Sequence, residues 1–196
     1  MSRPTGVNSA DTKQFIVEVA TKLFERKGYS ATSMGDIKNE TRYSKGTIYY
    51  HFKNKEELYL YCIKQVSDEF INSWNTKSSI GQSAEEQLYI WSELNHVMQE
   101  KPIMNTIYEY FVSTDQDSYE IVTELYEPEF EIVQEILEKG VTQGEFKKGL
   151  NIYEISVLLY NFISSLENLE LFGYRQRQEQ KNLYKHAIDL ILPGLK

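Results

Sequence analysis

The chain has 196 residues, of which 41% are hydrophobic and 26% charged, a balance that suits one domain or two small ones. Its single cysteine excludes an internal disulfide, and no apolar run approaches the roughly 20 residues of a membrane span or resembles a signal peptide. We therefore expect a cytoplasmic protein without membrane association.

The net charge of −8 averages two unlike regions. Residues 1–55 hold ten Lys and Arg against five Asp and Glu, a net charge of +5, whereas the remainder holds 11 against 24, a net charge of −13. A basic head on an acidic body indicates that the head alone meets a polyanion.

Nearly the whole chain is predicted to be helical, because apolar residues recur at helical spacing and no sustained alternation is bounded by turns. The first helix is expected over 10–27, with Gly28 ending it. The stripe expected on its buried face consists of Phe15, Val19, Leu23 and Phe24.

Two short helices follow, over about 33–40 and 44–52. The first opens with a pattern that resembles a capping box, in which Asp36 takes the place of the usual glutamate after Ser33. Only the turn 41–43 separates the two helices, and this arrangement is the helix-turn-helix pattern.

A longer helix is expected after Asn54, long enough to join two regions. Further helices are expected over 82–100, 102–113, 117–139, 151–172 and 176–192. Pro128 falls inside one of these patterns, so we expect it to break or kink that helix. Glycines at 140, 144 and 149 indicate a loop.

The stretch 44–52, SKGTIYYHF, carries more chemistry than a core helix needs. The second helix of a helix-turn-helix enters the major groove by its N-terminal end. There, Ser44, Lys45 and Thr47 place hydroxyls, an ammonium and backbone N–H groups that bind phosphate oxygens. Gly46 lets the backbone approach DNA closely.

The remaining positions of the stretch divide between packing and contact. Ile48 and Phe52, four residues apart, are expected to pack against the first helix. The side chains able to reach phosphate or a thymine methyl are Tyr49, Tyr50 and His51, and Lys53 and Lys55 add positive charge. Any amphipathic helix can carry a glycine and some aromatics, so the pattern by itself leaves core packing and DNA binding both open.

The segments LFERKGYSATSMGDI and SKGTIYYHFKNKEEL resemble the DNA-binding domain of the TetR family of bacterial one-component repressors, over about residues 10–60. The resemblance implies an all-α protein with a three-helix DNA-binding domain, 1–55, and a helical ligand-binding and dimerisation domain, 56–196. The DNA contacts that it implies are Ser44, Lys45, Gly46, Thr47, Tyr49, Tyr50 and His51, with Thr32 and Ser33 on phosphate and Lys53 and Lys55 as accessories.

The turn departs from the family pattern. The family usually has Ala-Gly-Val there, whereas this chain has Thr41-Arg42-Tyr43. If Arg42 adopts a positive φ, the strain costs about 1 kcal/mol. An additional phosphate contact from Arg42 would offset that cost.

The acidic half interleaves aromatic residues with glutamates. The simplest interpretation is that the rings form the core and the glutamates a solvated face. The alternative is a ring-lined pocket with one or two partly buried carboxylates, suited to a flat, lipophilic, cationic ligand. The resemblance, which extends weakly to a QacR-like multidrug-sensing branch, implies such a pocket. The candidate ligand-binding residues are Trp91, Tyr108, Glu109, Phe111, Tyr126 and Phe162.

The last two helical patterns are suited to an interface. Residues 152–172 are apolar on more than one face, and with 183–195 they are expected to supply two helices to a four-helix dimer interface. The resemblance implies a homodimer on a near-palindromic operator.

No phosphate-binding loop, nucleophile elbow or metal-ligand spacing occurs, so no cofactor, metal or enzymatic activity is predicted. The predicted function is that of a ligand-responsive repressor, released from double-stranded DNA by a small lipophilic molecule. The alternative is a ligand-independent DNA-binding regulator or a helical interaction module, which a C-terminal bundle without a cavity would favour.

Overall fold

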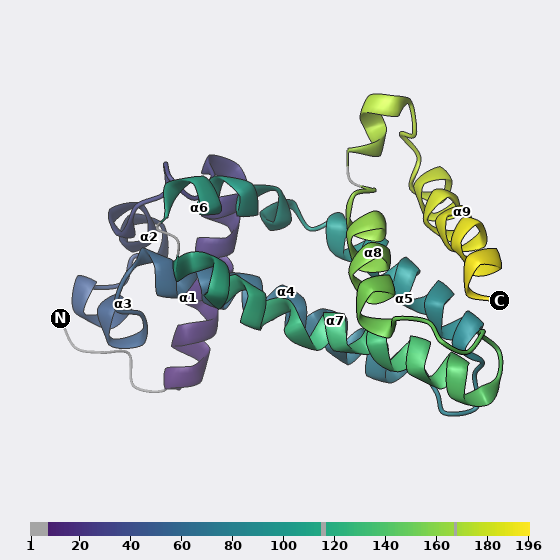
Figure 1. Ribbon diagram of the computed structural model, residues 1–196. Coiled ribbons are helices and arrows are strands. Elements are labelled where there is room, and N and C mark those ends of the chain that lie inside the picture. The colour runs from purple at the N-terminus through teal and green to yellow at the C-terminus, as the bar shows by residue number, and fades with distance from the viewer. Residues whose placement is uncertain (1–7, 115–116, 167) are drawn as a thin grey trace. The chain divides into compact units, whose positions relative to one another are not determined.

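A computed structural model describes residues 8–114, 117–166 and 168–196 (Figure 1). The described residues form helices and no strand, so the all-α prediction is confirmed. The chain divides into two compact units: unit 1 comprises Met1–Val66 and Pro102–Val122, and unit 2 comprises Ser67–Lys101 and Thr123–Lys196. The domain boundary expected at residue 55 stays a prediction.

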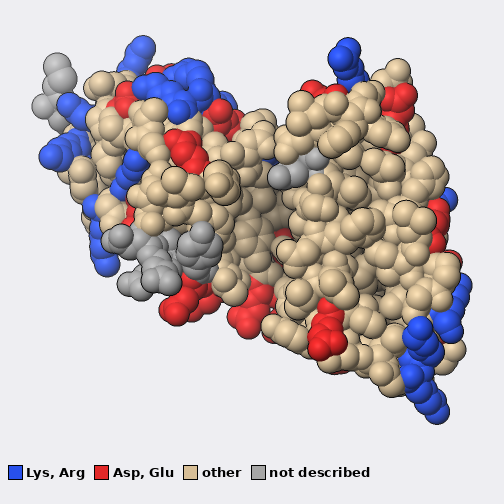
Figure 2. Space-filling model, turned by 45° about the horizontal axis from the view of Figure 1, so that its top comes forward, with Lys and Arg blue, Asp and Glu red and all other residues tan. Residues whose placement is uncertain are grey.

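Unit 1 begins with α1 (Ser9–Lys27), α2 (Met34–Thr41) and α3 (Lys45–His51), which contain the expected helix-turn-helix (Figure 1). The start of α4 (Lys55–Lys77), η1 (Pro102–Thr106), α6 (Ile107–Ser113) and the start of α7 (Asp117–Gln143) also belong to unit 1. Figure 2 shows a patch of Lys and Arg side chains on the surface of this unit.

The stripe predicted for α1 is partly wrong. Leu23 and Phe24 are buried as expected, but Phe15 is exposed and Val19 is half-buried. The other buried positions of this helix are Ile16, Val17 and Ala20. Both stripes obey the helical period, and only the neighbours of α1 decide between them. Phe15 instead packs its ring edge-on against Tyr43, with centroids 5.7 Å apart.

An aromatic cluster holds the late segment of unit 1 against the early one. The Tyr59 ring lies 4.8 Å from that of Tyr29 and 5.0 Å from that of Tyr110. The Tyr59 hydroxyl is 2.8 Å from Thr106 Oγ1. Because residues 102–113 contribute to this core, they pack with the head rather than with the acidic body.

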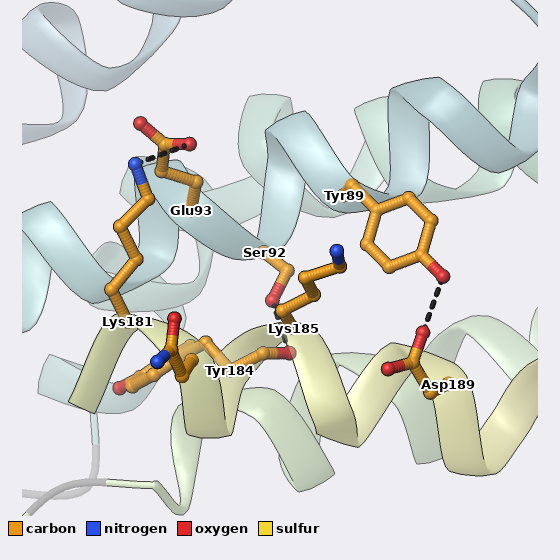
Figure 3. A pocket seen from close by; sticks show the side chains of 8 residues that line it. Tyr89, Ser92, Glu93, Lys181, Tyr184, Lys185 and Asp189 are labelled. Atoms are coloured by element: carbon orange, nitrogen blue, oxygen red, sulfur yellow. Dashed lines mark hydrogen bonds and ion pairs between the residues drawn. The ribbon is translucent and has the colours of Figure 1, made fainter. Parts of the chain in front are cut away.

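Unit 2 contains the rest of α4 and α7, together with α5 (Ala84–Gln99), α8 (Ile152–Ser164), η2 (Leu169–Phe172) and α9 (Arg177–Leu195). Helices α5 and α9 lie side by side (Figure 3). Ser92 Oγ of α5 donates a hydrogen bond of 2.9 Å to the Tyr184 carbonyl of α9, and Tyr89 donates to the Asp189 carboxylate. No helix of the described residues is long and apolar enough to cross a bilayer.

Two helix ends in unit 2 differ from the expected ones. Helix α7 is not broken at Pro128 and extends to Gln143, because buried apolar residues continue on both sides of the proline, whereas a kink at Pro128 stays a prediction. The helix expected over 151–172 ends at Ser164. Asn168 has a φ of 58°, a left-handed conformation that asparagine tolerates and an α-helix does not.

Candidate functional site

The first turn of α3 is built by its own side chains. Ser44 caps the helix by accepting a 3.1 Å hydrogen bond from Thr47 N, and the two hydroxyls lie 2.8 Å apart. On the opposite face, Ile48 and Phe52 are buried, as predicted. The cap and this anchor fix which face of the helix is open to a partner.

The open face of α3 carries most of the predicted contact residues. Ser44, Lys45, Gly46, Tyr49, Tyr50 and Lys53 are exposed, and Thr47 and His51 are half-buried. Tyr50 keeps 77% of its surface exposed, far more than a core tyrosine would. The Lys45 ammonium lies 5.4 Å from the centre of the Tyr49 ring. Hydroxyls, a cation and two phenols therefore share one short surface.

His51 adds a neutral side chain to this surface. Burial lowers the pKa of His51 below its ordinary value, and the nearby Lys13 lowers it further. Its ring lies 5.0 Å from that of Tyr50. At neutral pH, His51 therefore supplies a hydrogen-bonding group rather than a positive charge.

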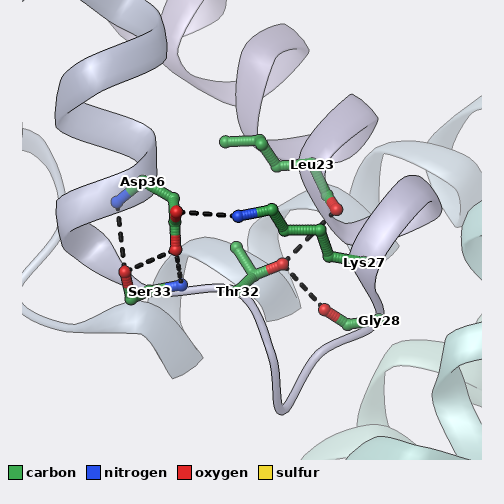
Figure 4. Close-up of polar contacts among 6 residues, drawn as sticks. All are labelled: Leu23, Lys27, Gly28, Thr32, Ser33 and Asp36. Atoms are coloured by element: carbon green, nitrogen blue, oxygen red, sulfur yellow. Dashed lines mark hydrogen bonds and ion pairs between the residues drawn. The ribbon is translucent and has the colours of Figure 1, made fainter.

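Helix α2 starts with the predicted capping box (Figure 4). Ser33 Oγ accepts from Asp36 N at 3.1 Å, and Asp36 Oδ2 accepts from Ser33 N at 2.9 Å. Lys27 Nζ lies 2.7 Å from Asp36 Oδ1. The hydrogen bond from Lys27, followed by those from Ser33, holds the pKa of Asp36 well below its ordinary value. Ser33 is exposed, so its place at the helix start is open to a phosphate.

Thr32 has a structural role inside the turn between α1 and α2. Its side chain is buried, and its hydroxyl donates to the Gly28 carbonyl at 2.7 Å and to the Leu23 carbonyl at 3.3 Å (Figure 4). A hydroxyl held inside the turn does not face a polyanion. The Thr32 hydroxyl therefore fixes the path between α1 and α2, and a phosphate contact from this residue stays a prediction.

Lys55 is also occupied within unit 1. Its ammonium donates to the carbonyls of Tyr29 and Ser30, at 2.8 and 3.4 Å, and lies 4.1 Å from the centre of the Tyr29 ring. Burial lowers the pKa of Lys55, although Glu109 acts in the opposite direction. These contacts make Lys55 a bridge from α4 to the turn after α1.

Glu109, a predicted ligand-binding residue, binds the same turn. Its carboxylate accepts hydrogen bonds from Tyr29 N at 3.0 Å and Ser30 N at 2.9 Å. Burial raises the pKa of Glu109, but the N–H donors outweigh burial and the pKa is lowered. Gly28, with a φ of 81°, leaves room for this carboxylate where a Cβ would collide with it.

The other candidates on α6 lie in unit 1 as well. Tyr108 is exposed and Phe111 is half-buried. The remaining three candidates, Trp91, Tyr126 and Phe162, lie in unit 2. The six predicted ligand residues are thus divided equally between the units, and neither unit gathers all of them.

In unit 2, the structure surrounds one buried acid with aromatic rings. Glu129 is 1% exposed. Its Oε2 atom lies 3.5 Å from the Tyr160 hydroxyl, and the Tyr160 ring centroid lies 6.3 Å from that of Trp91 and 5.9 Å from that of Phe130. Tyr126 interacts electrostatically with Tyr160. Trp91 and Tyr126 therefore belong to the surroundings of Glu129.

One oxygen of Glu129 lacks a hydrogen-bond partner. Glu129 Oε1 forms no hydrogen bond within the described part of the chain, and the same holds for Trp91 Nε1 and Ser156 Oγ elsewhere in unit 2. Burial raises the pKa of Glu129 to about 8, although the Ser67 and Tyr160 hydroxyls lower it. A buried carboxyl without a cationic partner is costly in its ionised form.

Sequence reasoning missed Glu129, although a signal was present. The residue lies on the buried stripe of α7 that includes Val122, Val133 and Ile136, at the helical spacings of 7, 4 and 3 residues. A glutamate at an apolar position of such a stripe differs from its neighbours Glu127 and Glu131, which are exposed. The stripe pattern singles out the one carboxylate of this segment that must be buried.

A second feature of unit 2 is a groove of about 480 Å³ along α5 and α9 (Figure 3). Its charged groups largely satisfy one another: Glu93 accepts from Lys181 at 3.1 Å and from Lys77 at 3.3 Å. None of the six predicted ligand residues lines it. The described residues also contain no cluster of three His, Cys, Asp or Glu that could hold a metal ion.

The comparisons with known proteins agree with this architecture. Residues 16–62 match the family model "Bacterial regulatory proteins, tetR family", and residues 65–196 match the model "QacR-like protein, C-terminal region". The chain belongs to the TetR family. As a TetR-family member it is a DNA-binding transcriptional regulator and not an enzyme.

Individual TetR-family relatives are distant. The chain is 33% identical over 100 residues to the transcriptional regulator QacR of Staphylococcus aureus, which covers 50% of this chain and 53% of QacR. It is 24% identical over 183 residues to the transcriptional regulator YfiR of Bacillus subtilis, covering 88% of this chain and 86% of YfiR.

Solved structures of transcriptional regulators share the fold. The FadR regulator of Bacillus subtilis in complex with stearoyl-CoA superposes with a TM-score of 0.81 at 18% identity, covering 93% of this chain and 99% of FadR. A regulator from Saccharomonospora viridis in complex with choline gives a TM-score of 0.75 at 21% identity, covering 93% and 96%.

Proposed function

We propose that this protein is a ligand-responsive repressor, which acts in the cytoplasm and binds a near-palindromic operator as a homodimer. The N-terminal turn of α3, with Ser44 and Lys45, binds phosphates at the edge of the major groove. Tyr49 and Tyr50 reach toward the base edges. Support comes from the exposure of these side chains on a helix anchored by Ile48 and Phe52.

The dimer forms through the outer faces of the last elements. The large apolar side chains left exposed on α8, η2 and the segment through α9 are Tyr153, Leu158, Phe162, Leu171, Phe172, Tyr174 and Leu190. Monomeric proteins rarely leave so much apolar surface open, and a two-fold contact would cover it on both copies. Phe162 is thereby reassigned from the ligand site to the interface. A two-fold dimer places the α3 helices of its two protomers about 34–36 Å apart, which is one turn of DNA.

The effector is a lipophilic cation, and the single observation that carries this choice is Glu129. A buried carboxyl with an unpartnered oxygen, next to Tyr160 and the aromatic residues Trp91 and Tyr126 that interact with Tyr160, is completed by a positive charge with an apolar body. The neighbours of this fold bind stearoyl-CoA in one case and choline in another. The fold accepts unlike ligands, so the choice rests on this chain's own residues.

Release requires the ligand to favour a conformation that binds DNA poorly, since equal affinity for both conformations shifts nothing. Helix α6 provides a route. It follows α5 and precedes α7 in the chain, and Glu109 ties it to Tyr29 and Ser30, in the turn between α1 and α2. A displacement of α6 would therefore move the turn that leads into α2 and the helix-turn-helix.

The test begins with the operator. DNA fragments selected by the purified protein give the site, and fluorescence anisotropy then gives its affinity. Tetraphenylphosphonium, a permanent lipophilic cation, should weaken operator binding at least tenfold, whereas the neutral triphenylphosphine oxide should act much less.

Two outcomes would contradict the proposal. Absence of any selected sequence would remove the assignment of α3. Operator affinity that neither compound changes, together with an unchanged melting temperature, would favour the alternative, a regulator that responds to no ligand.

A further inference from the structure

Glu129 raises a question that the proposed effector does not answer, namely how its charge is balanced when no ligand is present. The carboxyl is buried on α7, next to side chains of α4 and α8. The groups that act on it are the hydroxyls of Ser67 and Tyr160, and burial outweighs both. None of them carries a positive charge.

The described surroundings offer no counter-charge to Glu129. Within residues 8–114, 117–166 and 168–196, Glu129 forms no ion pair with Lys, Arg or His. The titratable groups that face it are Tyr160 of α8 and, next to Tyr160, Tyr126 of α7. Both are phenols, which are neutral at physiological pH.

An ionised carboxylate in such a place would lose its hydration without gaining a partner. Proteins avoid that cost by leaving the group protonated. A cation placed against the carboxyl reverses the balance, because charge attraction is strong where water is excluded. The same residue therefore has opposite preferred states in the free and the ligand-bound protein.

We propose that Glu129 exchanges its proton for the positive charge of the effector: the carboxyl is protonated in the ligand-free protein and ionises when a lipophilic cation binds. This inference rests on the proposed function. The O–H bond of the carboxyl breaks, its electron pair stays on the carboxylate, and the proton passes through water to the buffer. Net charge inside the site does not change, since one positive charge replaces another.

The exchange has a functional consequence for selectivity. A neutral compound of similar shape gains no ionised partner and leaves the proton in place. A cation must compete with protons, so its apparent affinity weakens as the pH falls. With a carboxyl pKa of about 8, the competition is strong at neutral pH and disappears in mildly alkaline solution.

The test is calorimetric titration of the full chain with tetraphenylphosphonium, in buffers of different ionisation enthalpy. We expect the release of about 0.9 proton per bound cation at pH 7 and less than about 0.1 at pH 9.5. The apparent affinity should be roughly a hundredfold weaker at pH 6 than at pH 9. Triphenylphosphine oxide should release no proton at any pH.

Two variants make the test specific. Glu129→Gln, which resembles the protonated carboxyl in shape, should abolish proton release, weaken cation binding at pH 9 and remove its pH dependence. Glu131→Gln, which removes an exposed carboxylate two residues away, should behave like the wild type. Infrared difference spectra should show the carbonyl band of a protonated carboxyl disappearing on cation binding in the wild type but not in Glu129→Gln.

The outcomes separate this inference from the proposed function. If the cation binds and releases operator DNA without proton release at pH 7, or if release persists in Glu129→Gln, the exchange is wrong and the proposed function stands. If the cation does not bind even at pH 9, where no proton competes, both are wrong.

Discussion

The two units of this protein treat buried polar groups differently. In unit 1, the buried hydroxyls of Thr32, Thr41 and Tyr59 have hydrogen-bond partners, as does the carboxylate of Glu109. In the part of the chain that the structure describes, the buried side-chain atoms without a partner all lie in unit 2, on Trp91, His96, Glu129 and Ser156.

The difference reflects two tasks. The DNA-binding unit must hold one geometry whether or not DNA is present, so hydrogen-bonded polar groups stabilise it. A sensor must gain interactions from its ligand, and unpartnered polar atoms supply them because the ligand removes their desolvation cost. An incomplete interior is therefore expected where a ligand completes it.

The largest effect should come from disrupting the proposed dimer face of α8. Leu158 is 70% exposed and Phe162 is 40% exposed. Replacing both with Glu should give a folded monomer in sedimentation experiments, because charges of the same sign would meet across the two-fold axis. Operator affinity should fall by about a thousandfold or more, because a monomer binds only one half-site and loses the gain from a second, tethered α3 helix.

The matched control is Ile80→Glu, which places the same charge on a side chain that is 97% exposed between α4 and α5. It should leave both the dimer and DNA binding unchanged. A doubly substituted α8 face that still dimerises would place the interface elsewhere.

A smaller effect is expected from the reading helix. Lys45→Ala or Tyr49→Ala should each weaken operator binding about 10- to 100-fold per dimer, because each removes one contact from both half-sites. Circular dichroism and sedimentation should remain those of the wild type, since both side chains are exposed. Lys148→Ala, which removes an exposed lysine of unit 2, serves as the control. Gel shifts indistinguishable from wild type would show that α3 does not read the operator.

The unsatisfied interior of unit 2 predicts an unusual pH dependence of stability. The pKa of Glu129 is raised from an ordinary 4.5 to about 8, so folding favours the protonated form. Its contribution to stability is fully present below pH 4.5 and is lost as the pH rises through 8. Glu129→Gln should therefore gain stability relative to wild type by up to about 1.4 kcal/mol per pH unit across that window.

Urea unfolding of both proteins between pH 5 and 9 measures this difference. Glu131→Gln should show no comparable trend. A constant difference between wild type and Glu129→Gln across the range would show that the carboxyl titrates normally.

Removing the hydrogen-bonded carboxylate of unit 1, Glu109, should lower stability, whereas removing the charge of Glu129 raises it. Glu109→Ala removes two hydrogen bonds to backbone N–H groups and should lower the free energy of unfolding by roughly 1–3 kcal/mol. Tyr108→Ala, which changes an exposed neighbour on the same helix, should cost less than about 0.5 kcal/mol. Equal unfolding midpoints for the two variants would mean that the Glu109 contacts contribute no net stability.

The smallest effect concerns Arg42, whose φ is 58°. Arg42→Asn should raise stability by a few tenths to about 1 kcal/mol, because asparagine tolerates this conformation better. If Arg42 contacts a phosphate in each half-site, the variant should also show a weaker salt dependence of operator binding. An unchanged salt dependence, with Lys148→Asn as the control, would limit Arg42 to the turn itself.

The sequence by itself determined the features that depend on neighbouring residues. The capping box joins Ser33 to Asp36, three positions along the chain, and occurs as predicted. The Ser44 cap of α3 is equally local, and Arg42 has the positive φ on which the expected strain depended. Helix type follows from a periodicity that a single segment carries. Such interactions are readable because no distant residue can move them.

Only the tertiary structure decided which polar side chains bind other parts of the protein and which do not. Glu109 finds its partner 80 residues earlier in the chain, and Lys55 and Thr32 are drawn into the same turn instead of facing outward. Glu129 acquires its character from helices α4 and α8 beside it. Burial is a property of what packs against a residue, so glutamates along one helix diverge into solvated charges and a buried acid.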